Sequence, residues 1–77
     1  MDLTGQVKEL VQAELNLAKI SDVACQQDHA EWDSLSYLRI LSALESAFKI
    51  EVSSQNINSF NSIPNIVREI EKQKQHR

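Results

Sequence analysis

The scarcity of turn-forming residues is the feature that most restricts what this chain can fold into. Its 77 residues include one glycine, Gly5, and one proline, Pro64. A small all-β fold needs such residues at many turns, whereas helices joined by polar loops do not. The hydrophobic content of 42% is high enough for a packed globule rather than a disordered segment. We therefore expect an all-α fold.

Length limits this fold to one small domain. A chain of 77 residues buries only about 60% of its unfolded surface, which leaves no room for a deep catalytic cleft with a supporting shell. We treat residues 1–77 as a single domain with a basic tail at about 72–77. A monomer is the default expectation.

Hydrophobic periodicity predicts a helical bundle with one long loop. A first amphipathic helix is expected over about 4–18, capped by Asp2 or Thr4. Residues 19–33 lose the period and form the loop, with Ile20, Val23 and Cys25 tucked against the bundle. The second helix begins at residue 34, and its expected apolar stripe is Leu35, Leu38, Leu41, Leu44 and Phe48, widened by Ile40, Ala43 and Ala47.

Two shorter helices are expected after the second. A short one over about 54–59 is capped by Ser53 or Ser54. The last begins after Ser62, with Pro64 in its first turn, where a missing N–H costs little. Its buried stripe is Ile63, Ile66, Val67 and Ile70.

Charge and targeting signals exclude several classes of protein. Residues 1–51 hold nine acids and four bases, a net charge of −5, and the remainder has two acids and four bases, a net charge of +2. An acidic body disfavours a nucleic-acid partner. No signal peptide and no apolar run of the roughly 20 residues that cross a membrane are visible. The single cysteine, Cys25, suits a reducing compartment, and we expect a cytoplasmic location.

The start of the second helix carries the candidate site. Asp33 is the expected N-cap, which places Ser34 in the first turn and Trp32 opposite Tyr37 as a hydrophobic staple. An exposed hydroxyl at this positive helix end suits a phosphodiester. Taken alone, Asp33-Ser34-Leu35 is a weak signal, because Ser34 can equally be one more polar residue at a helix start.

The order of features around this serine resembles the acyl carrier and peptidyl carrier family. Asp33-Ser34-Leu35 matches the family's modification motif at the start of its second helix. Leu44-Glu45, Phe48 and Ile50-Glu51-Val52 are similar to the end of that helix, and Phe60-Asn61-Ser62-Ile63 to the entry of the last. The resemblance implies an acyl-carrier-like four-helix bundle with a long loop between helices 1 and 2 and a short third helix.

The resemblance also implies a cofactor, partners and a non-catalytic role. Ser34, flanked by Asp33 and Leu35, would receive 4′-phosphopantetheine from coenzyme A by a phosphopantetheinyl transferase. A ligase or transferase would load the arm as a thioester, and downstream biosynthetic enzymes would use it. Trp32 either packs, which we favour, or contacts the arm. The implied partner-facing residues are Ser36, Leu38, Arg39, Ser42, Glu45 and Ser46. Leu44, Phe48, Ile57 and Phe60 either border a groove for an acyl chain or simply pack in the core.

Departures from the family pattern favour a specialised pathway. Carriers of bulk fatty acid synthesis usually have a strongly acidic second helix, whereas residues 34–47 contain one acid, Glu45, and one base, Arg39. Glu31-Trp32 replaces the usual Gly-Ala before the motif. We therefore expect a dedicated carrier of a secondary-metabolite pathway. The alternatives are an aminoacyl carrier loaded by an adenylating ligase and an unmodified helical interaction module.

A metal or thiol site is a weaker hypothesis. Cys25 and His29 are four residues apart, and Asp28, Glu31 and Asp33 lie nearby. Two ligands do not make a metal site, and a solvated acidic loop is the simpler interpretation.

Overall fold

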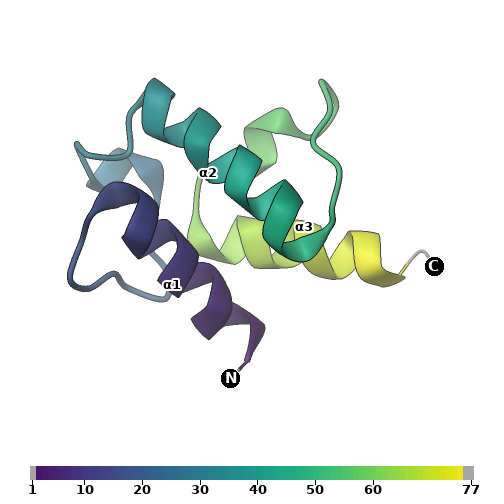
Figure 1. Cartoon of the computed structure of the whole chain (residues 1–77), viewed down its shortest axis with the longest axis horizontal. Coiled ribbons are helices and arrows are strands. Elements are labelled where there is room, and N and C mark those ends of the chain that lie inside the picture. Colours follow the sequence, from purple (N-terminus) through teal and green to yellow (C-terminus); the bar gives the residue numbers. More distant parts are fainter. Residues whose placement is uncertain (1, 76–77) are drawn as a thin grey trace.

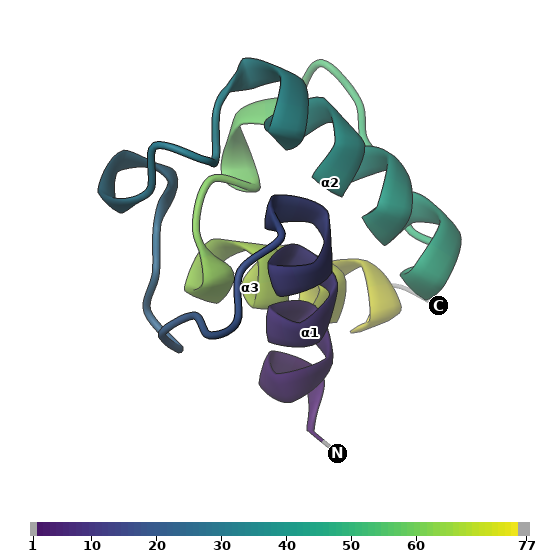
Figure 2. The same cartoon turned by 60° about the vertical axis from the view of Figure 1, so that its left-hand side comes forward.

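Three α-helices enclose one hydrophobic core in the computed structural model, which describes residues 2–75. They are α1 (Leu3–Leu15), α2 (Ser34–Phe48) and α3 (Ile63–Gln75), with single 3-10 turns η1 (Gln26–Asp28) and η2 (Ile57–Ser59) in the connections. Helix α1 packs against both α2 and α3, and η2 packs against α3 (Figures 1 and 2). The expected all-α fold is confirmed for the described residues.

The helix ends follow from local hydrogen bonds. The carboxylate of Asp2 accepts the N–H of Gly5 at 2.8 Å, so Asp2 rather than Thr4 caps α1. This helix ends three residues earlier than expected because Asn16 adopts the left-handed conformation, with φ of 58°. Lys49 does the same after α2. Glycine is the usual residue at such ends, and the only one in this chain, Gly5, lies in α1.

A 3-10 turn takes the place of the expected third helix. The side chain of Asn56 accepts the N–H of Ser53 at 2.7 Å and donates to the carbonyl of Glu51 at 3.1 Å. Such side-chain bonds compete with the helical backbone pattern. Helical geometry is therefore limited to Ile57–Ser59, and the described residues form three α-helices instead of four.

The buried face of α2 differs from the expected stripe. Ile40, Leu41 and Leu44 are buried as expected, but Leu35 and Leu38 are 60% and 56% exposed. At 100° per residue, Leu35 lies about 160° and Leu38 about 100° round the helix from Tyr37, which packs against the core. Both leucines therefore belong to the solvent side of α2.

The long loop after α1 is attached to the entry of α3. The N–H of Gln26 donates to the carbonyl of Asn61 at 2.7 Å, and the N–H of Ile63 donates to that of Ala24 at 2.9 Å. Ile20 and Ala24 are buried as anchors. Val23, expected to be tucked in, is 71% exposed, because a turn in which its N–H bonds the hydroxyl of Ser21 directs it outward.

Helix α3 begins and packs as the sequence predicts. The hydroxyl of Ser62 accepts the N–H of Asn65 at 3.2 Å, which makes Ser62 the cap. Ile63, Ile66 and Ile70 are buried, and Val67 packs beside them. The helix continues through residues 72–75 of the basic segment, and residues 76–77 lie outside the described part.

Candidate functional site

The start of α2 presents Ser34 on a fixed support. Asp33 is the N-cap as predicted, and its carboxylate accepts the N–H of Ser36 at 2.9 Å. This backbone hydrogen bond holds the pKa of Asp33 below its usual value. Ser34 and Leu35 follow as exposed first-turn residues. The hydroxyl of Ser34 is thus accessible at the positive end of a capped helix.

Trp32 anchors the chain just before this serine. Its side chain is 1% exposed, and its backbone N–H donates to the carbonyl of His29 at 3.0 Å. The packing interpretation of Trp32 is therefore confirmed, while the proposed staple with Tyr37 stays a prediction. The indole nitrogen is buried without a hydrogen-bond partner among the described residues. A residue this deeply packed fixes where α2 begins.

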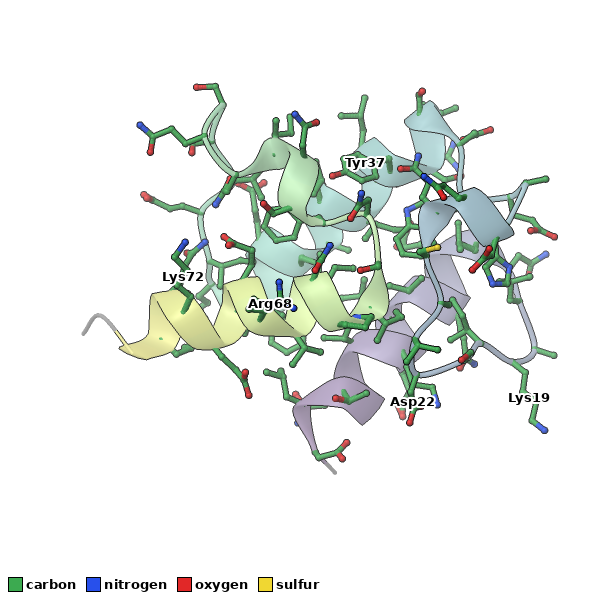
Figure 3. All side chains as sticks on the ribbon, turned by 180° about the vertical axis from the view of Figure 1, so that it is seen from behind. Lys19, Asp22, Tyr37, Arg68 and Lys72 are labelled. Carbon is green, nitrogen blue, oxygen red and sulfur yellow. The ribbon has the colours of Figure 1, made fainter. Side chains whose placement is uncertain are left out.

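Tyr37 connects α2 to the chain around η2, a role that the sequence did not reveal. Its hydroxyl donates to the carbonyl of Ile57 and accepts the N–H of Phe60 at 3.3 Å. Burial raises the pKa of this phenol. In Figure 3, Tyr37 lies between α2 and the segment that contains η2. The hydroxyl therefore holds two segments side by side.

A surface groove of about 570 Å³ opens beside Ser34. Helix α2 contributes Ser34, Tyr37 and Leu38, whereas the other lining residues come from the two connections between the helices and are Gln26, Ile57, Asn58 and Asn61. These lining residues include no histidine, cysteine or carboxylate. The groove lining therefore consists of side-chain amides, two hydroxyl groups and apolar side chains.

The residues predicted to face partners lie on α2, and of these only Leu38 lines the groove. Leu38, Arg39, Ser42, Glu45 and Ser46 are exposed, and Ser36 is half-buried. Arg39 makes no ion pair with any residue of the described range 2–75. One carboxylate oxygen of Glu45 accepts the N–H of Val52 at 3.3 Å, which leaves that side chain partly engaged.

The four predicted acyl-groove residues do not gather at one surface. Leu44 and Phe60 are fully buried in the core, and Phe48 packs against it. Only Ile57 lines the groove beside Ser34. Leu44 and Phe60 therefore pack in the core, which was the alternative given for these positions.

The loop residues considered for a metal or thiol site engage in separate local contacts. The thiol of Cys25 donates to Asp28 at 3.2 Å, and Nδ1 of His29 lies 3.9 Å from a carboxylate oxygen of Glu31. Within residues 2–75, there is no group of three or more His, Cys, Asp or Glu side chains that could hold a metal ion. The helices described here are also too short or too polar to cross a membrane.

Comparison with known proteins identified one family. The model described as "phosphopantetheine attachment site" matches residues 5–70, a range that contains α1 from its third residue, all of α2 and the first eight residues of α3. Searches of curated proteins and of solved structures found no match.

Proposed function

Because this chain belongs to the phosphopantetheine attachment family, whose members carry 4′-phosphopantetheine covalently on a serine, we propose that it is an acyl carrier protein with Ser34 as the attachment residue. The observation that supports this choice most strongly is the exposed Ser34 in the first turn of α2, directly after the N-cap. The chain would hold its cargo, and partner enzymes would carry out the reactions.

The surroundings of Ser34 fit the group. A phosphodiester on this hydroxyl lies at a helix N-terminus, where the backbone dipoles favour negative charge. The groove beside Ser34 offers a surface along which an extended arm can lie. Asp33 and Leu35, the flanking residues of the motif, support it by capping the helix and by remaining exposed for a modifying enzyme.

In the attachment reaction, the serine oxygen acts as the nucleophile. The hydroxyl oxygen of Ser34 attacks the β-phosphorus of coenzyme A, a new P–O bond forms, and the bond to the adenosine-bisphosphate portion breaks. The proton of Ser34 passes to a base of the transferase, since the groove lining contains no carboxylate, histidine or cysteine to accept it. Once attached, the arm supplies a terminal thiol that carries acyl groups as thioesters.

The charges around Ser34 support a dedicated carrier of a specialised pathway. The solvent side of α2 carries Arg39 as its one base and Glu45 as its one acid. A partner that binds this helix by a strongly basic surface would meet the like charge of Arg39. We infer that its loading and processing enzymes present a neutral or acidic docking surface, as suits partners of a secondary-metabolite carrier.

The test is conversion of the purified protein by a broad-specificity phosphopantetheinyl transferase with coenzyme A. Intact mass spectrometry should show one phosphopantetheinyl addition on the wild type and on Ser54→Ala, a control at an exposed serine outside α2. Ser34→Ala should gain nothing while keeping its helical circular dichroism spectrum. An unmodified wild type, under conditions that convert a known carrier, would instead favour an unmodified interaction module.

A further inference from the structure

Three side-chain amides line the groove beside Ser34, and they have unused hydrogen-bonding groups. Gln26 and Asn58 make no side-chain hydrogen bond with any described residue, although both line the groove. Asn61 accepts from the amide of Asn65 at 3.0 Å, and its own NH₂ group has no acceptor among residues 2–75. A groove with several free amide donors and acceptors suits a ligand with amide groups.

Apolar side chains line the groove together with these amides. Leu38 is 56% exposed although it is a large hydrophobic residue, and Ile57 lies across the groove from it, half-buried. The pantetheine portion of the arm has two amide groups separated by short alkyl segments, with a dimethyl-substituted carbon near the phosphate. The groove therefore matches the arm in both polar and apolar character.

Hydrogen bonds within the protein hold the segments that line the groove in place. The backbone hydrogen bond of 2.7 Å between Gln26 and Asn61 fixes the loop against the entry of α3. The hydroxyl of Tyr37, on α2, connects this helix to the segment across the groove through hydrogen bonds with Ile57 and Phe60. A site whose walls are held by internal hydrogen bonds has a lower ordering cost of binding, and attachment at Ser34 gives the arm a high effective concentration there.

We propose that this groove, through Gln26, Asn58 and Asn61, binds the pantetheine portion of the arm on Ser34 and holds it along the protein surface between partner encounters. The inference rests on the proposed function. The proposal concerns the arm alone, because Leu44 and Phe60, two of the residues predicted to border an acyl groove, are fully buried and do not line this groove.

The experiment measures hydrogen exchange of the arm itself. Holo protein is prepared with coenzyme A whose pantetheine amides are ¹⁵N-labelled, and the exchange rates of these two amides are compared with those of free labelled pantetheine by NMR. One net hydrogen bond in the docked state predicts about five-fold slower exchange for at least one amide. The double variant Gln26→Ala/Asn58→Ala should return that rate to within about two-fold of the free value.

Gln27→Ala is the matched control, because Gln27 is an exposed glutamine next to Gln26 that does not line the groove. It should keep the wild-type protection. Exchange at the free rate in wild-type holo protein, or full protection in the double variant, would overturn the docking proposal while leaving the carrier function intact. Failure to attach the labelled arm, detected by mass before exchange, would refute the carrier function, and arm docking with it.

Discussion

Removing the hydroxyl of Tyr37 tests whether this single group holds α2 to the chain around η2. In Tyr37→Phe the aromatic ring stays, but the carbonyl of Ile57 and the N–H of Phe60 lose their partner. A net hydrogen bond contributes about 1 kcal/mol, and a partly buried backbone group left unpaired costs about 1 kcal/mol more. We therefore expect the free energy of unfolding to fall by about 2 kcal/mol, which in a domain of this size lowers Tm by roughly 8–16 °C.

Urea denaturation at neutral pH measures this change, with Ser46→Ala as the control because Ser46 is an exposed residue of the same helix. The control should stay within about 0.5 kcal/mol of wild type. Amide exchange at Phe60 should also accelerate in Tyr37→Phe. A loss below about 0.5 kcal/mol with unchanged exchange at Phe60 would show that the hydroxyl does not join these segments.

Three further predictions concern other parts of the fold. Leu44→Ala should lower the free energy of unfolding by about 2–5 kcal/mol, whereas Leu38→Ala, at an exposed position, should lower it by less than about 0.5 kcal/mol. Equal losses for the two variants in urea denaturation would contradict the assignment of the buried and exposed faces of α2. The pKa of Asp33 is lowered in the folded state, so the ionised carboxylate stabilises the fold above the usual value of 3.8, and this stabilisation is lost as the pH falls through the folded pKa. In Asp33→Asn, the free energy of unfolding should therefore fall less steeply as the pH is lowered than in wild type. Identical curves for the two proteins would refute the capping role of Asp33. Gln73 bonds both the N–H and the carbonyl of Glu51, at 2.9 and 2.8 Å, so Gln73→Ala should accelerate amide exchange at Glu51, and unchanged exchange would argue against that clasp.

Local signals allowed the first residues of α2 and α3 to be predicted well. Asp33 and Ser62 cap α2 and α3 as expected, because a cap depends on a side chain and a backbone N–H only a few residues away. The buried isoleucines of α3 follow from their spacing alone. The place of Ser34 in the first turn of α2 was predictable for the same reason, whereas its proposed role came from the resemblance of the surrounding sequence to the carrier family.

Features that depend on tertiary contacts were not predictable. The contact between Tyr37 and Ile57 joins residues twenty apart, and Gln26 reaches Asn61 through a backbone bond between loop and helix entry. Periodicity indicated one apolar stripe on α2 that included Leu38, whereas in the structure α2 packs against α1 and Leu38 lies outside the core. The groove beside Ser34 is built from these long-range contacts, so the sequence alone does not indicate that its amide-bearing residues lie together.

The central claim is tested most directly by tandem mass spectrometry of the protein isolated from its own cells, without added transferase. Fragmentation of the peptide that contains Asp33-Ser34-Leu35 should release phosphopantetheine and localise it to Ser34. The other serine-containing peptides should have their unmodified masses. Finding this peptide entirely unmodified would contradict the carrier assignment, and finding the arm on another residue would contradict the assignment of Ser34 as its attachment site.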